Sequence, residues 1–542
     1  MTTQVEERVS PLLEPARFDA PAAGTRRWRS WLGNHGHLLL ALVGAIAFVI
    51  VKPPVADLQA ADARAAAAAR HVGLGYWLSW FGGSTPGQYS VLTPALASIV
   101  GTTVLAALSV LAIAAMARPL LEGTMRPRSG AYLVSLSALC NLWSGRVPFA
   151  VGIAVSLFGL LLLRRNRPIL GGVVNGVATL FSPLGPAFIL LALVGPAIAR
   201  PAWRPNLIRF GVPSAIGLVL PTVIFGAPSP MPFAWTTLAW SVGIIAAATL
   251  LELPKHVKIG LWAAAVACLG AFVIPSGVGA NISRFAFLLV PPVIWAVARN
   301  PKRAIALALL PAFVYSGYLV SADLTAASRP AAQQTYYTGL RTELAALPGR
   351  DNHRAEVLDT TTHRAAAELI PTVYLARGWE TQSDSTNNAI FYNPALLNPA
   401  SYRDWLDSNA VAWVAVPTAP GSSYQAEAAL VKGGLPYLDQ IWRDDQWTLY
   451  SVHLAEPMVP APAKVISASE TEVVFDLDQA ATLTLRFRPA RGIRITSQEG
   501  LGTPVCLAAP TPDALQATFT EPGRYLITSS WSVASTVSKT GC

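Results

Sequence analysis

Long apolar runs, interrupted by Pro, Gly and Arg, fill the sequence from about His37 to Val320. A helix needs about 20 apolar residues to cross a bilayer, with about 17 as a practical lower limit. About eleven runs reach or approach this length, at residues 37–55, 92–117, 130–144, 147–163, 169–183, 185–199, 207–226, 233–251, 257–274, 284–298 and 303–322. The sequence therefore predicts an α-helical polytopic membrane bundle of about eleven spans.

The composition supports this prediction. Charged residues make up only 13% of the 542 residues, and hydrophobic residues make up 53%. Soluble domains contain about 25% charged residues, so this composition excludes a disordered chain and disfavours a single large water-soluble domain. The formal net charge is +10. In a membrane protein, Lys and Arg residues collect in the cytoplasmic loops, and this accounts for the positive charge. The charge therefore does not indicate a nucleic-acid partner, and none is predicted.

Basic residues are confined to alternate loops of the predicted bundle. With the N-terminus inside, the cytoplasmic loops contain Arg118, Arg126, Arg128, Arg164, Arg165, Arg167, Arg200, Arg204, Arg209, Lys255, Lys258, Arg299, Lys302 and Arg303. The short external loops contain only Arg146 and Arg284. This alternation follows the positive-inside rule, and an odd number of spans places the C-terminal region outside. We therefore expect a plasma-membrane (inner-membrane) protein with a cytoplasmic N-terminus.

Shifts in composition divide the chain into four regions. Residues 1–36 are a polar cytoplasmic tail, and residues 37–322 are the transmembrane domain, with a first external loop at 53–91. Residues 323–456 alternate short apolar strands with helical stretches, which predicts an external α/β domain. Residues 463–542 alternate apolar and polar positions, which predicts an external β-rich module.

Two arginines depart from the charge pattern because each lies at the outer mouth of a span. Arg146 follows Ser144-Gly145, and Arg284 follows Ile282-Ser283. One interpretation is that each side chain extends to an external lipid headgroup. The other is that both guanidinium groups converge on a phosphate, because their forked donors suit phosphate oxygens.

The first external loop is rich in aromatic residues. Its Ala-rich part, residues 57–71, is predicted to be helical, and a cluster of aromatic residues follows it. The cluster is either an interfacial aromatic belt or a lipid- or sugar-facing groove, because aromatic rings stack on the apolar faces of sugars. In the second interpretation the candidate substrate-binding residues of the loop are Tyr76, Trp77, Trp80, Gln88 and Tyr89.

Polar residues also follow two predicted strands of the external α/β domain, where such sheets commonly hold binding groups. These candidates are His363, Arg377, Trp379, Glu380 and Asp384. The alternative is a pair of solvated loops. No Ser-His-Asp triad, phosphate-binding Gly loop or metal-ligand spacing is recognised, so no metal site is predicted and metal dependence stays open.

The four cysteines are too few for a disulfide framework. Cys140 and Cys268 lie in apolar runs and are expected to be inert packing residues. Cys506 and Cys542 lie in the external region, where oxidation is allowed. We predict a disulfide between these two residues.

The chain resembles the GT-C superfamily of membrane glycosyltransferases in its N-in bundle, its long first external loop and its C-terminal external domain. The segment from Phe81 to Ser90, which leads into a span, is similar to the Gly/Pro/Tyr segment that often follows the first loop there. The chain looks closer still to a group of actinobacterial integral membrane proteins, on residues 76–81, 144–146 and 375–380. That second resemblance implies no activity.

The GT-C resemblance implies a polyprenyl-phosphate sugar as donor substrate and a cell-envelope glycan or glycolipid as acceptor. These enzymes typically have a catalytic carboxylate, or an Asp/Glu pair, early in the first external loop. Here only Asp57 and Asp62 are available, five residues apart and without the usual surroundings. The resemblance implies that one of them is the general base for an acceptor hydroxyl, while Arg146 or Arg284 holds the lipid phosphate.

Two other functions remain open from the sequence. One is a transporter or flippase of a lipid-linked precursor, which the many spans favour. The near absence of ionisable residues at mid-membrane speaks against it, because coupled transporters usually need such residues. The other is a non-catalytic envelope assembly factor whose external domain binds glycan or a partner protein.

Overall fold

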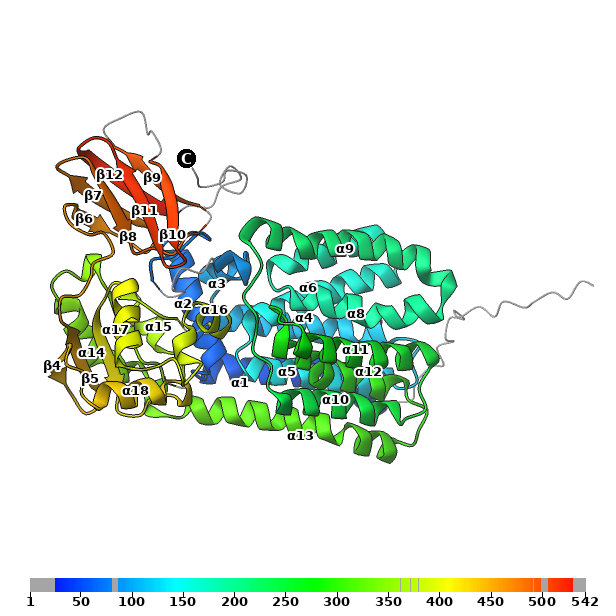
Figure 1. The fold of residues 1–542 in the computed structure, drawn as a ribbon. Helices are drawn as coiled ribbons and strands as arrows, with labels where there is room; N and C mark the ends of the chain where they lie inside the picture. The colour runs from blue at the N-terminus through cyan, green and yellow to red at the C-terminus, as the bar shows by residue number, and fades with distance from the viewer. Residues whose placement is uncertain are drawn as a thin grey trace, which may run out of the picture.

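The computed structural model describes residues 25–79, 86–360, 362–370, 372–378, 380–490, 492–498 and 505–529. It consists of a helical bundle with an α/β domain and a β module at one end (Figure 1). The helices of the bundle are α1 (Thr25–Val51), α4 (Thr102–Leu121), α5 (Pro127–Trp143), α6 (Val147–Arg164), α7 (Pro168–Val177), α8 (Leu184–Ala199), α9 (Arg204–Phe225), α10 (Trp235–Thr249), α11 (Lys255–Val273), α12 (Val290–Val297) and α13 (Lys302–Ala327). The first long loop, which is predicted to be external, contains α2 (Ala56–Ala69) and α3 (Thr93–Val100).

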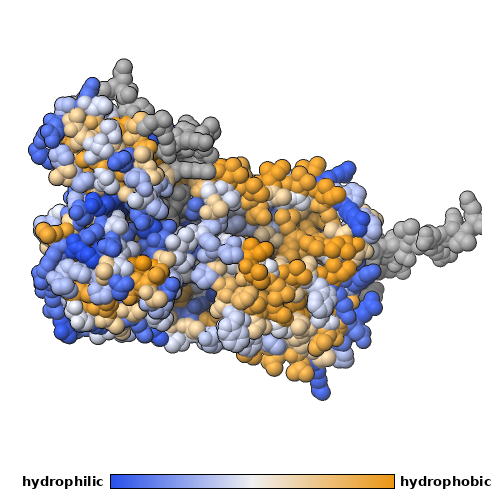
Figure 2. All heavy atoms as spheres, in the orientation of Figure 1, coloured by the Kyte–Doolittle hydropathy of each residue, from blue (hydrophilic) through white to orange (hydrophobic). Residues whose placement is uncertain are grey.

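The bundle has the dimensions and the surface of a membrane domain. Within the described residues, seven helical segments are long and apolar enough to cross a membrane, and three further apolar helices are shorter. Hydrophobic side chains cover the visible side of the bundle, and hydrophilic side chains gather at its ends (Figure 2). The chain is therefore a multi-pass membrane protein. One predicted run, 92–117, is two helices rather than one, because Gly101 adopts a φ of 86° between α3 and α4.

The loops of the bundle gather alternately at its two ends. At the basic end, the Arg126 guanidinium donates a 2.8 Å hydrogen bond to the Asn300 carbonyl. At the opposite end, the Met231 N–H donates a 2.9 Å hydrogen bond to the Ser276 carbonyl. The α/β domain and the β module lie beyond this second end (Figure 1). The arginine-rich loops and the C-terminal domains are thus on opposite sides of the bundle.

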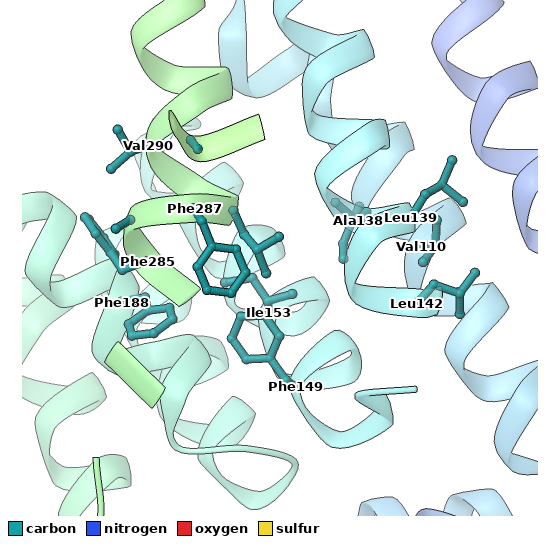
Figure 3. Close-up of a cluster of buried hydrophobic side chains, with 14 of the residues drawn as sticks. Val110, Ala138, Leu139, Leu142, Phe149, Ile153, Phe188, Phe285, Phe287 and Val290 are labelled. Carbon is teal, nitrogen blue, oxygen red and sulfur yellow. The ribbon is translucent and has the colours of Figure 1, made fainter. Parts of the chain in front are cut away.

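Three phenylalanines form part of the bundle core near the second end. The ring of Phe188 packs edge-to-face with Phe149 and Phe285, at centroid distances of 5.9 and 5.6 Å (Figure 3). Such pairs contribute about 0.5–1.5 kcal/mol beyond their buried area. They fix α6, α8 and the π-helical turn Phe285–Leu289 relative to one another. Arg146 and Arg284 directly precede two of these elements.

The α/β domain contains one five-stranded sheet. Its elements are α14 (Thr338–Ala346), β1 (Arg354–Val357), α15 (Ala365–Leu369), β2 (Tyr374–Leu375), α16 (Thr381–Asn387), α17 (Pro399–Ser408), β3 (Val411–Pro417), α18 (Gln425–Lys432), β4 (Leu438–Arg443) and β5 (Trp447–Val452). The strand order is β2-β1-β3-β5-β4, with β2, β1 and β3 parallel. Strands and helices alternate along this part of the chain.

The β module contains two antiparallel sheets. The strands are β6 (Lys464–Ala468), β7 (Glu472–Leu477), β8 (Ala481–Leu485), β9 (Ile493–Ser497), β10 (Leu507–Thr511), β11 (Ala514–Phe519) and β12 (Gly523–Ser529). The strand orders are β6-β7-β12-β9 and β10-β11-β8. Val473, Phe475 and Leu477 alternate into the core, as the apolar–polar pattern predicts.

The aromatic segment of the first loop lies between these two modules, so the described part of it does not form a belt at the membrane surface. Tyr76 and Leu78 are buried in the β-module core, and Trp77 is buried in the α/β core. One short segment therefore supplies side chains to both cores. The Leu78 carbonyl accepts a 2.9 Å hydrogen bond from the buried Arg354 guanidinium, which joins the loop to β1.

Candidate functional site

Asp57 lies in the first turn of α2, where the helix dipole favours an anion. The turn between α5 and α6 packs against this helix because Gly145 has a φ of 73° and no Cβ. A Cβ there would lie 2.7 Å from the Leu58 backbone nitrogen. The turn thereby places Arg146 next to α2, and its Nε donates a 3.2 Å hydrogen bond to Asp57 Oδ2. Two residues predicted from the sequence are thus in direct contact.

A second carboxylate, Asp323 near the end of α13, faces the same guanidinium. Its Oδ2 lies 3.7 Å from Arg146 Nη2. The Arg146 side chain is 14% exposed, and those of Asp57 and Asp323 are about one-third exposed. Sequence reasoning missed Asp323. Its position could have identified it, because it is an acidic residue directly after the last apolar run, at the predicted outer end of that span.

Arg284 lies beside this ion-pair cluster. Its guanidinium carbon is 5.5 Å from the centroid of the Phe149 ring, and its charge interacts with those of Arg146, Asp57 and Asp323. Within the described part of the chain, no carboxylate lies within ion-pair distance of Arg284 and no hydrogen bond holds its guanidinium. The π-helical turn that follows it is a feature often found at functional sites. The two guanidinium groups are close enough to interact electrostatically, and among the described residues only Arg146 has a carboxylate within ion-pair distance.

The cluster extends along α2 through Arg64, which lies seven residues after Asp57 and therefore on the same helix face. The buried Arg64 guanidinium lies 4.3 Å from the centroid of the Tyr89 ring and 3.8 Å from Glu380 Oε2. Burial, and then the charge of Asp57, raise the pKa of Tyr89, so its hydroxyl stays protonated. Burial raises the pKa of Glu380, although Arg64 opposes the shift. Sequence reasoning also missed Arg64. Its seven-residue spacing from Asp57 in a predicted helix could have placed both residues on one face.

Asp62 lies outside this arrangement. It accepts a hydrogen bond from the Thr102 hydroxyl at the start of α4. The five-residue spacing puts it on a different face of α2 from Asp57, as the sequence predicts. The structure therefore brings only one of the two loop carboxylates into contact with a candidate phosphate-binding arginine.

His363 belongs to the loop after β1, which contacts α2 from the other side. The Arg364 guanidinium of this loop donates a 3.0 Å hydrogen bond to Gln59 Oε1. His363 Nδ1 bonds to Asp359 Oδ2. Burial alone would lower the pKa of His363, but Asp359, with a further contribution from Asp57, raises it. A partly exposed imidazole therefore lies within electrostatic range of the candidate base.

Arg377 and Asp384 are predicted either to bind substrate or to lie in a pair of solvated loops, and the structure shows that they are not solvated. Both are buried, and Arg377 Nη2 lies 2.8 Å from Asp384 Oδ2. The same guanidinium lies 2.9 Å from Glu427 and 3.3 Å from Glu356. These two residues were missed because they lie on a buried strand and a helix far away in the sequence. One arginine thus serves three buried carboxylates and is not presented to a ligand.

The remaining candidates have structural contacts or lie outside the described residues. Gln88 Nε2 donates a 3.0 Å hydrogen bond to the Phe225 carbonyl and ties the first loop to α9. Tyr76 Oη accepts a 3.2 Å hydrogen bond from the Arg488 N–H. Trp77 lines a pocket between α2 and α3. The candidates that lie outside the described residues are Trp80 and Trp379.

Three of the four cysteines lie in the described residues. Cys506 is disulfide-bonded, and its predicted partner Cys542 lies outside the described residues. Cys140 and Cys268 are free thiols inside the bundle. In the described ranges, no group of three or more His, Cys, Asp or Glu side chains could hold a metal ion.

Comparison with known proteins gives structural neighbours. No protein-family model and no curated protein matches the chain. A cryo-EM structure of the arabinofuranosyltransferase AftD from Mycobacteria is similar over 95% of this chain and 60% of that chain, with 12% identity and a TM-score of 0.41. ArnT from Cupriavidus metallidurans in the apo state is similar over 79% of this chain and 98% of that chain, with 12% identity and a TM-score of 0.43. This chain therefore spans less than two thirds of the length of AftD.

Proposed function

We propose that this protein is a GT-C-like membrane glycosyltransferase. It transfers a sugar from a polyprenyl-phosphate donor to a cell-envelope glycan or glycolipid at the outer face of the plasma membrane. The observation that carries the proposal is the position of Arg284, beside the Arg146–Asp57 pair and without a counter-ion among the described residues. A phosphate offers acceptor oxygens to both guanidinium groups.

The ion pairs suggest how donor binding prepares the base. In the ligand-free structure Arg146 is shared by Asp57 and Asp323. A phosphate bound between Arg146 and Arg284 competes with Asp57 for the guanidinium, while Asp323 keeps Arg146 in place. The released Asp57 carboxylate then accepts the proton of an acceptor hydroxyl.

The transfer step balances with these groups. The acceptor oxygen forms a bond to the anomeric carbon, and the bond between that carbon and the phosphate oxygen breaks. The acceptor proton goes to Asp57, and the polyprenyl phosphate leaves as an anion. Arg146 and Arg284 stabilise the charge that develops on the leaving phosphate.

The topology that we propose places this site at the outer face. All eleven predicted runs coincide with helical segments, and the loops alternate between two ends. Eleven crossings with the basic loops inside leave the N-terminus in the cytoplasm and the α/β domain and β module outside. The cluster of Asp57, Arg146 and Arg284 then lies at the membrane boundary, where a lipid phosphate is found.

Matched carboxamide variants test the proposed function. In cells that depend on this chain, Asp57→Asn is expected to reduce incorporation of the transferred sugar into envelope glycan by at least about 100-fold, the usual effect of a general base. Asp62→Asn is the control, because Asp62 accepts a hydrogen bond from Thr102 and forms no ion pair with an arginine within the described residues. The measurement is the glycan profile at equal membrane expression. Unchanged glycans in the Asp57→Asn strain would refute the carboxylate mechanism.

A further inference from the structure

A pocket of about 280 Å³ lies between α2 and α3. One wall is formed by Arg64, Ala68, His71, Val72, Leu74 and Trp77, and the other by Val91, just before α3, and by Pro94 and Ala95 of α3. Most of this lining is aliphatic or aromatic. Arg64 is a charged residue at one side, and it is buried beside Tyr89 and Glu380.

The pocket continues the helix face that carries the candidate base. Asp57, Arg64 and Ala68 are separated by seven and four residues, so their side chains lie in one row along α2. At about 1.5 Å per residue, the row from Asp57 to Ala68 is about 16 Å long. Tyr89 lies between the two ends of the row, because its hydroxyl interacts with Asp57 and its ring contacts Arg64. In the ligand-free structure the buried Arg64 and the Tyr89 ring lie between the pocket and the Asp57 carboxylate, so a ligand that reaches the base from the pocket displaces these two side chains.

The pocket also lies at the edge of the membrane domain. Its α3 wall belongs to a short helix that connects the first loop to α4. The outer side of α3 exposes Leu96, Ile99 and Val100, and Ile99 is 78% exposed. Exposed aliphatic side chains at this height are suited to lipid contact. An apolar chain can therefore enter the pocket from the bilayer.

We propose that this pocket binds the apolar anchor of the acceptor, so that the acceptor is an amphiphilic glycolipid rather than a free glycan. The inference rests on the proposed function, since it assigns the acceptor for the site at Asp57. The chain occupies the aliphatic pocket, and the sugar extends past Arg64 toward the base. The donor phosphate remains at Arg146 and Arg284, at the other end of the α2 row.

Photocrosslinking of the full-length protein in lipid nanodiscs tests this assignment. The probe is decyl glucoside with a diazirine in the alkyl chain, and crosslinked peptides are identified by mass spectrometry. We expect crosslinks to residues 68–77 and 91–95. Ala95→Trp, which fills the pocket from an exposed position, is expected to reduce their yield about tenfold. Ala66→Trp, at an exposed position of α2 that does not line the pocket, is the control and is expected to have no effect.

Binding of farnesyl phosphate distinguishes the acceptor pocket from the donor phosphate site at Arg146 and Arg284. Ala95→Trp is expected to leave this binding unchanged, which also shows that the variant is folded; Ala68→Leu is a milder second variant. Crosslinking that Ala95→Trp does not reduce, or that methyl glucoside displaces as well as decyl glucoside, would overturn the inference. Loss of farnesyl phosphate binding in folded Ala95→Trp would assign the pocket to the donor chain and would also overturn it. Farnesyl phosphate binding that survives Arg146→Gln with Arg284→Gln would instead contradict the proposed function.

Discussion

The buried cluster around Arg377 makes the α/β domain sensitive to pH. Burial raises the pKa of Glu427 to about 7, although Arg377 opposes this shift. Burial, and then Glu427, raise the pKa of Glu356 well above its usual value. Burial alone would raise the pKa of Asp384 as well, but Arg377 holds it below its usual value. Asp384 is therefore the ionised partner of Arg377, and the two glutamates retain protons in the folded state.

The sign of the pH effect follows from Glu427. Its pKa is higher in the folded state than in the unfolded state, so its contribution to stability is complete below about pH 4.5 and is lost as the pH rises through about 7. Asp384 is ionised in both states over this window. The free energy of unfolding of the α/β domain is therefore expected to fall between pH 5.5 and pH 8, by at most about 1.4 kcal/mol per pH unit for one proton, and the apparent melting temperature falls with it.

Glu427→Gln tests this expectation, because an amide cannot lose the proton. Thermal unfolding in nanodiscs at pH 5.5 and pH 8 should show a smaller pH dependence in this variant than in the wild type. Glu472→Gln, at an exposed position of β7, is the control. An identical pH dependence in the wild type and in Glu427→Gln would show that Glu427 does not hold the extra proton.

Part of the site could be predicted at the level of residues. Arg146 and Arg284 were identified because they depart from the charge pattern, and Asp57 because it is one of two carboxylates in the helical part of the first loop. Their partner Asp323 could not be identified, because a pairing across 177 positions leaves no local pattern. The Arg377 cluster was misread for the same reason, since charge in a sequence does not reveal whether partners from other elements bury it.

Helices α7 and α9 approach closely through two glycines. A Cβ on Gly217 of α9 would lie 2.4 Å from the Gly176 Cα of α7. Small residues commonly permit such contacts between membrane helices. On the same helix, a Cβ on Gly211 would meet no atom within 4 Å. An alanine at Gly217 therefore changes both helix packing and helix propensity, whereas an alanine at Gly211 changes helix propensity alone.

Alanine substitutions at these two positions give a prediction about the bundle. Gly217→Ala is expected to destabilise the bundle by about 1–3 kcal/mol, because the added methyl group forces α7 and α9 apart. Gly211→Ala should be neutral or stabilising by up to about 1 kcal/mol, since alanine is the better helix former. Thermal unfolding in nanodiscs measures both. Equal melting temperatures for the two variants would show that the close contact is absent.

Elements with a strong periodic pattern were predictable, and those defined by a single residue or by tertiary contact were not. The strands of the α/β domain and the helix in the first loop follow from apolar runs and alanine content. The break at Gly101 depends on one backbone angle within a continuous apolar run. The burial of Tyr76 and Trp77 depends on two modules that meet around them, which aromatic content alone does not distinguish from a membrane belt.

At the level of the whole molecule, the first external loop connects all three parts. Its helix α2 carries Asp57 toward the bundle, and its aromatic segment fills the cores of the α/β domain and the β module. The buried Arg354 guanidinium bonds to carbonyls of the loop, the α/β domain and the β module. The external region therefore holds α2, and with it the candidate base, against the mouth of the bundle.

The most direct test of the central claim is a cryo-EM map of the protein in nanodiscs saturated with a polyprenyl phosphate. The account predicts phosphate density within hydrogen-bond distance of the Arg146 and Arg284 guanidinium groups, with Asp57 no longer bonded to Arg146. Phosphate density at another place, with the 3.2 Å bond between Arg146 and Asp57 intact, would contradict it.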